Sequence, residues 1–318
     1  MRSGCAIGAV RNSGVARAVL AVALGACLLS ACGSSAPHRT QGPSKRAPAA
    51  SIVAAPVEVA HTRLGAVGYR VLGNGPPVVL IMGFGGTMED WYPAFVDALA
   101  RGHRVVVFDN AGVGRTRALP APLTISAMAN QTSALIATLR LGQPDVLGWS
   151  MGGMIAQALA ALHPSQVRRL VLSATQAGTG GALPLPRAAA AAAASGNPVA
   201  VLATLFPADQ TAAADAYAAG VLSYPVHAPV PRATALAQTG ALVAWLRGAD
   251  PAGPRISTIH SPTLVADGAV DALDPVANDR QLARLIAHAR LVLYPGAGHA
   301  FLFQDERAFV ARLDSFLS

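Results

Sequence analysis

The chain has 318 residues and a formal net charge of +8, from 24 basic and 16 acidic side chains. Six basic residues and no acid precede residue 57, so the remainder carries only about +2 and gives no reason to expect a nucleic-acid partner. No cysteine follows Cys32, which excludes a disulfide, a thiolate metal site and a cysteine nucleophile from the rest of the chain.

Residues 1–31 have the pattern of a secretory signal. Basic residues without an acid precede an apolar run at 18–29 that is too short to span a bilayer. The segment 29–33 then resembles the bacterial lipobox, in which the cysteine is acylated and becomes the mature N-terminus. We therefore expect lipidation at Cys32 and a lipoprotein anchored outside the cytoplasmic membrane. Cys27 is a weaker candidate because cleavage there would cut the apolar run short, and an ordinary cleaved signal is the alternative.

Residues 32–56 are rich in serine, proline and basic side chains, and we predict a flexible tether there. The remaining segment, 57–318, is long enough for one hydrophobic core.

Within this segment, apolar strands alternate with helical patterns. Residues 57–71 indicate two antiparallel edge strands, and further strands are expected at 78–82, 104–108, 145–149, 170–174, 263–266 and 290–294. Helices are expected at 91–100, 125–139, with Thr124 as its cap, and 151–162. This alternation predicts an α/β fold with a doubly wound, mostly parallel sheet.

The pattern changes at about 176–259, where helices are expected at 188–195, 198–206, 211–222 and 233–246 with no strand between them. An all-helical insertion between two core strands predicts a cap over a site. Its sparse charge suggests an apolar pocket. Trp149 and Trp245 are candidate substrate contacts, although such residues belong more often to the core.

The segment 146–154 is the most informative motif, because an apolar strand enters Gly148-Trp149-Ser150-Met151-Gly152 and a helix follows. Glycines without a Cβ let strand and helix pack closely and leave the Ser150 hydroxyl projecting above the sheet. Ser150 is therefore the candidate nucleophile. The alternative is a glycine-rich turn whose serine caps a helix.

A nucleophilic serine also needs donors for the oxyanion and a base for its proton. The glycine-rich run at 83–86 follows a buried strand, so the backbone N–H groups of Phe84 and Met151 are the candidate oxyanion hole. Of the histidines, only His299 follows a late strand on a glycine-rich loop, which makes it the candidate base.

Three aspartates after the strand at 263–266 compete as the acid that orients the base. Asp267 lies close to the strand, and Asp274 precedes a proline that starts a turn or helix. We favour Asp271, because the loop can curl back over the sheet after Gly268.

The order Ser150, Asp271, His299 resembles that of the α/β-hydrolase fold family, and so do the runs at 83–86, 108–116, 148–153 and 295–299. The resemblance covers 57–318 and implies a serine hydrolase of the esterase, lactonase and haloperoxidase-like group. It implies cleavage of small apolar carboxylic esters or lactones without a metal or organic cofactor. A serine at the elbow argues against the branches that use an aspartate there.

Two other functions stay open. The same triad could carry out perhydrolysis, thioester cleavage or hydrolysis of a C–C bond, since pocket shape decides the reaction. A binding lipoprotein without catalysis on a hydrolase scaffold is the second alternative, because fold alone does not establish function.

Overall fold

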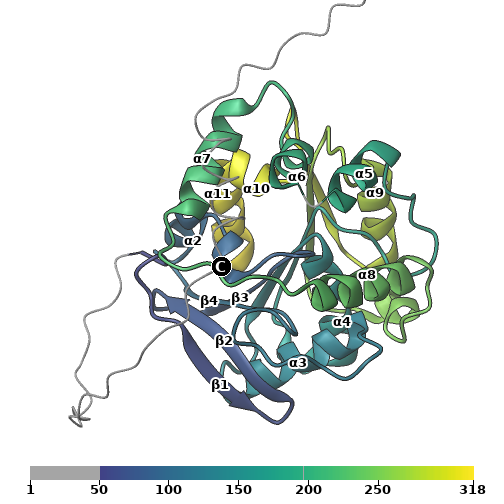
Figure 1. Cartoon of the computed structure of the whole chain (residues 1–318). Helices are drawn as coiled ribbons and strands as arrows, with labels where there is room; N and C mark the ends of the chain where they lie inside the picture. Colours follow the sequence, from purple (N-terminus) through teal and green to yellow (C-terminus); the bar gives the residue numbers. More distant parts are fainter. Residues whose placement is uncertain (1–50, 196) are drawn as a thin grey trace, which may run out of the picture.

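A computed structural model describes residues 51–195 and 197–318, and its centre is an eight-stranded sheet (Figure 1). The strands lie in the order β1-β2-β4-β3-β5-β6-β7-β8. Strands β1 and β2 run antiparallel to their neighbours, whereas the remaining six pair in parallel. The predicted fold class is confirmed.

Helices cover both faces of the central strands, which explains the nearly continuous runs of valine, leucine and isoleucine in these strands. The strands span β1 (Glu58–Thr62), β2 (Gly65–Leu72), β3 (Pro77–Ile81), β4 (Arg104–Phe108), β5 (Asp145–Trp149), β6 (Leu170–Ser173), β7 (Thr263–Gly268) and β8 (Arg290–Tyr294).

Two apolar clusters form the core, one with α3, α4 and α9 and the other with α2, α10 and α11. These helices span α2 (Pro93–Leu99), α3 (Ile125–Thr138), α4 (Met151–Leu162), α9 (Val276–Leu285), α10 (Phe301–Gln304) and α11 (Glu306–Leu317), and short 3₁₀ helices lie at Met88–Asp90, Pro164–Gln166 and Gly253–Thr258. The predicted cap of α3 is present, because the Thr124 hydroxyl accepts a hydrogen bond from Ala127 N at 3.0 Å. Within the described residues, no helix is long and apolar enough to cross a membrane.

Four helices lie between β6 and β7, and we refer to them as the cap. They are α5 (Arg187–Ala194), α6 (Pro198–Leu205), α7 (Thr211–Leu222) and α8 (Arg232–Leu246), each within one residue of the predicted bounds. Tyr217 and Tyr224 donate hydrogen bonds from their hydroxyls to Asp90 O and Trp91 O, at 3.0 and 3.1 Å. The cap is therefore tied to the chain that follows β3.

The predicted boundary between tether and domain, at residue 57, is too late. Ile52 is fully buried in the core, and its N–H donates to the Asp97 carboxylate at 2.8 Å. The buried Arg70 guanidinium donates to Ala55 O. The composition of this stretch is that of a linker, but one isoleucine and two backbone hydrogen bonds anchor it. The predicted signal at 1–31, Cys32 and the tether up to residue 50 lie outside the described residues.

Candidate active site

The predicted site residues follow four strands of the parallel part of the sheet. Ser150 follows β5, Asp271 and His299 follow β7 and β8, and the glycine-rich run at 83–86 follows β3. Because the carboxyl ends of parallel strands share one edge, the fold brings these four segments to the same rim.

Ser150 occupies a sharp turn between β5 and α4, with φ 57° and ψ −124°. The turn depends on close backbone packing: a Cβ on Gly148 would lie 2.2 Å from Gly152 O, and one on Gly152 would lie 1.9 Å from Ile81 O. Both backbone groups of the serine are fixed, since Ser150 N donates to Ser173 O at 2.9 Å and the Thr175 hydroxyl donates to Ser150 O at 2.8 Å. The side chain itself remains partly exposed.

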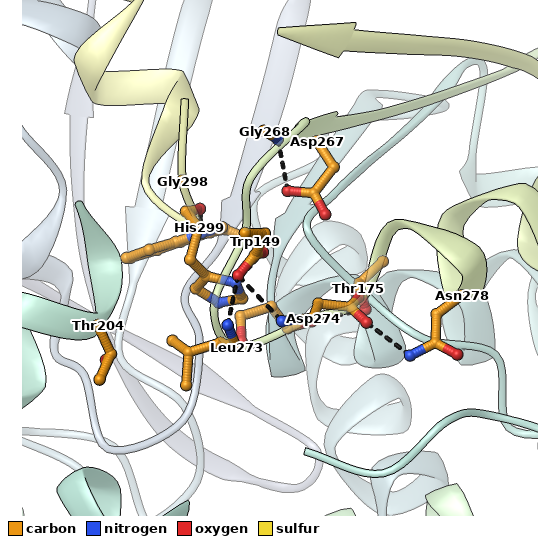
Figure 2. A network of polar contacts seen from close by, with 12 residues as sticks. Trp149, Thr175, Thr204, Asp267, Gly268, Leu273, Asp274, Asn278, Gly298 and His299 are labelled. Atoms are coloured by element: carbon orange, nitrogen blue, oxygen red, sulfur yellow. Dashed lines mark hydrogen bonds and ion pairs between the residues drawn. The ribbon is translucent and has the colours of Figure 1, made fainter. Parts of the chain in front are cut away.

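Asp271 and His299 form a close pair, with Asp271 Oδ2 at 2.7 Å from His299 Nδ1. The Asp271 side chain is fully buried and its other oxygen accepts from the N–H groups of Leu273 and Asp274, at 2.6 and 2.9 Å. Trp149 donates from its indole nitrogen to His299 O at 3.0 Å, which ties the histidine loop to the residue before Ser150 (Figure 2).

Within the described residues, the Ser150 hydroxyl forms no hydrogen bond with the His299 ring. Catalytic hydrogen bonds are often long in ligand-free proteins and tighten in the substrate complex. The serine-to-imidazole contact therefore stays a prediction.

Burial alone would lower the pKa of His299, because it penalises the charged ring. The charge and hydrogen bond of Asp271, with the charge of Asp274, outweigh burial and raise the pKa above its usual value of 6.5. The arrangement therefore favours the charged imidazolium that forms when His299 takes a proton.

The other two candidate acids have different partners. Asp267 Oδ1 accepts from Gly268 N at 2.7 Å, and Asp274 Oδ1 accepts from the side-chain amides of Gln176 and Asn278, at 2.8 and 2.7 Å. Figure 2 shows Asp274 turned towards Asn278 and Asp267 beside Gly268, both away from the His299 ring. Of the three aspartates, the structure pairs only Asp271 with the imidazole.

Asp267 and Asp274 form a buried acid cluster with Asp279, which the sequence analysis missed. One carboxylate oxygen of each residue lies within 4.8 Å of one oxygen of each of the other two. Among the described residues, four of the six oxygens are buried without a hydrogen-bond partner. Burial raises the pKa of Asp274 to about 6 and of Asp279 to about 8, and raises that of Asp267 well above its usual value. The spacing would suit a cation, but protons suffice to balance the charge, so we assign no ion here.

The candidate oxyanion donors lie on either side of the elbow. Met151 is the first residue of α4, so its N–H has no acceptor within the helix. Phe84 follows Gly83, where a Cβ would lie 3.2 Å from Ser150 Cβ. These positions suit two donors next to the hydroxyl, and their role stays a prediction.

The two tryptophans predicted to contact substrate are both well packed. Trp149 packs its ring against Phe303, with centroids 5.1 Å apart, and supports the His299 loop. Trp245 is fully buried and donates to Gln176 O at 3.0 Å. These contacts give both side chains a structural role, and contact with substrate stays a prediction.

Gln238 of α8 also reaches the site, although no sequence pattern pointed to it. Its Oε1 accepts a hydrogen bond from Gly85 N at 2.9 Å, across 153 positions of sequence. Such a contact has no local signal, because α8 alone gives no indication of which loop it covers.

A cavity of about 650 Å³ lies elsewhere, between residues 53–57 and the stretch 225–231. The buried Arg70–Glu89 ion pair, with its N–O distance of 3.1 Å, is part of its wall. None of its lining residues is Ser150, Asp271 or His299, so we do not connect this cavity with the chemistry.

Comparisons with known proteins agree with this fold. A protein assigned as the non-heme bromoperoxidase BpoC of Mycobacterium tuberculosis is 44% identical over 105 residues, which cover 33% of this chain and 40% of that protein. A protein assigned as the carbamate hydrolase RutD of Pseudomonas syringae is 31% identical over 261 residues, 77% of this chain and 95% of that protein. The enol-lactonase of Burkholderia xenovorans superposes with a TM-score of 0.67 and 27% identity, covering 82% of this chain and 99% of that one. The family model for the alpha/beta hydrolase fold matches residues 76–306, and this chain belongs to that family.

Proposed function

We propose that the protein is a serine hydrolase that cleaves apolar carboxylic esters or lactones through an acyl-enzyme. The observation that carries the proposal is the buried Asp271–His299 pair, at 2.7 Å, at the same rim of the sheet as a serine on a strained turn. The relatives with hydrolase and lactonase names support the same class of reaction.

In this mechanism, His299 removes the proton of Ser150 while the hydroxyl oxygen attacks the ester carbonyl. The N–H groups of Phe84 and Met151 stabilise the oxyanion of the tetrahedral intermediate. Asp271 holds the ring in the correct tautomer and stabilises its charged form. His299 then protonates the leaving alcohol, and a water molecule repeats the sequence to release the acid.

A fluorophosphonate probe tests the nucleophile, because it phosphonylates activated serines. We expect labelling of the wild-type protein and none of Ser150→Ala, with loss of hydrolysis of p-nitrophenyl esters. Ser173→Ala is a matched control, because Ser173 lies on the neighbouring strand and takes no part in the proposed chemistry. Equal labelling of wild type and Ser150→Ala would refute the proposal.

Perhydrolysis on the same triad is a second candidate, favoured by the bromoperoxidase name of one relative. Peroxide-dependent halogenation measured beside hydrolysis of a p-nitrophenyl ester series distinguishes the two. Halogenation at a rate comparable with hydrolysis would favour this candidate, whereas hydrolysis alone favours the esterase.

We also propose that the full chain is exported and held at the membrane by lipid on Cys32. The lipobox-like run at 29–33 supports this, and two or more acyl chains suffice for firm anchoring. Metabolic labelling with palmitate should modify the wild type and Cys27→Ala but not Cys32→Ala. Labelling that survives Cys32→Ala and disappears in Cys27→Ala would move the anchor to the other cysteine.

A further inference from the structure

Gln238 connects the cap to the loop that carries a proposed oxyanion donor. The loop, residues 83–86, follows β3, and Gly85 N donates to Gln238 Oε1 at 2.9 Å. Gly85 directly follows Phe84, whose N–H is proposed to face the oxyanion. A hydrogen bond at Gly85 therefore acts one peptide unit away from that donor.

Gly85 is open on the side where a side chain would stand. Its φ is +65°, and no atom outside its neighbours lies within 4 Å of the position where a Cβ would stand. Phe84 is 39% exposed. Among the described residues, the contact with Gln238 is the one hydrogen bond made by residues 83–86, and it restrains the direction of this part of the loop.

The Gln238 side chain carries a free-energy cost for folding at this position. Its side chain is fully buried, and its Nε2 has no partner among the described residues. A buried donor without a partner costs about 1–3 kcal/mol. An apolar side chain of similar length would avoid this cost but would leave the partly buried Gly85 N without this acceptor, so the two effects of the glutamine on stability oppose each other.

We infer that Gln238 is a positioning residue, which holds the 83–86 loop so that the Phe84 N–H points at the oxyanion. The inference rests on the proposed function and gives the cap a part in the chemistry besides covering the site. A donor that must be aligned acts on the transition state, because the oxyanion is absent from the bound ester and develops on the way to the tetrahedral intermediate.

Gln238→Met is the direct test, because it keeps the length of the side chain and removes its hydrogen bonds. We expect kcat on a p-nitrophenyl ester to fall by about 10- to 100-fold, while KM changes by less than about 3-fold. The rate of fluorophosphonate labelling should fall with kcat. The melting temperature should change little, because the variant removes the unpaired Nε2 and also the acceptor of Gly85 N; a purely structural glutamine would lower it.

Thr234→Val is the matched control on the same helix. The Thr234 hydroxyl donates to Gly112 O at 2.9 Å, which joins α8 to a loop without an oxyanion donor. We expect its kcat to remain near that of the wild type. The inference is overturned if Gln238→Met keeps wild-type kcat, if only KM rises, or if both variants lose kcat equally. A wild-type protein that neither hydrolyses esters nor labels at Ser150 instead overturns the proposed function, and the inference with it.

Discussion

The strained backbone conformation of Ser150 is stabilised by hydrogen bonds to neighbouring residues. A non-glycine residue in such a conformation costs about 1–3 kcal/mol. Here the N–H of Ser150 is bound to Ser173 and its carbonyl to Thr175, so the surrounding strands fix the conformation. The strain leaves the hydroxyl partly exposed at the edge of the sheet, where a nucleophile must be.

Asp271→Asn tests the pairing with His299 through pH dependence. The histidine must be neutral to take the serine proton, so activity should rise as pH passes through its pKa, which lies above 6.5 in the wild type. Without the charge of Asp271 that pKa falls, and the rising limb of kcat/KM should move to lower pH. We also expect kcat to drop by about 10⁴-fold, because asparagine does not hold the ring in the correct tautomer.

Asp267→Asn is the control for this experiment. Asp267 accepts a hydrogen bond from Gly268 N, and its charge is not among those that raise the pKa of His299. Its pH profile should match that of the wild type. An Asp271→Asn profile with the wild-type midpoint would contradict the assignment of Asp271 as the partner of His299.

At the scale of elements, the sequence predicted what local patterns encode. Apolar periodicity and glycine spacing are visible within a window of about a dozen residues. They therefore predict the elbow, the six parallel strands and the four cap helices. Asp271 was chosen over its neighbours by its place in a loop, and the structure brings it to His299.

Contacts between distant segments had no such signal. Gln238 meets Gly85 only through the docking of α8, and Asp279 joins the buried acid cluster only through the packing of α9 against β7. The composition of 51–56 predicts a linker, although Ile52 is buried in the core and hydrogen bonds to Asp97 and Arg70 anchor this stretch.

Gly152→Ala tests whether the close contact of β3 and α4 is required. The added Cβ would lie 1.9 Å from Ile81 O, a backbone atom that cannot move without shifting the sheet. We expect a loss of more than about 3 kcal/mol in unfolding free energy, or no soluble protein. Gly240→Ala in α8 should instead stabilise by up to about 1 kcal/mol, because that helical glycine has open space. Equal denaturant midpoints for the two variants would contradict the steric argument.

At the scale of the whole molecule, rising pH has opposite effects on catalysis, through His299, and on folding stability, through the buried acid cluster. Rising pH neutralises His299 and favours catalysis, whereas it removes protons from the acid cluster and opposes folding. Asp267 belongs to β7, Asp279 to α9, and Gln176, which binds Asp274, follows β6. The cluster therefore joins the two strands that flank the cap, and its ionisation should loosen that junction.

Asp279→Asn tests this coupling of pH to stability. The folded pKa of Asp279 is about 8, well above that of an unfolded aspartate near 3.8. Between these values the native state holds a proton that the unfolded state has released, so stability is full at low pH and is lost as pH rises through the folded pKa. Asparagine has no such proton to lose and should make the molecule more stable at pH 8 by about 1–3 kcal/mol, with little change at pH 4.

Melting temperatures between pH 4 and pH 8 measure this effect, and Asp215→Asn, at an exposed aspartate, is the control. If Asp279→Asn follows the wild-type curve in parallel, the cluster does not control stability, and the loss of protons must be balanced in another way.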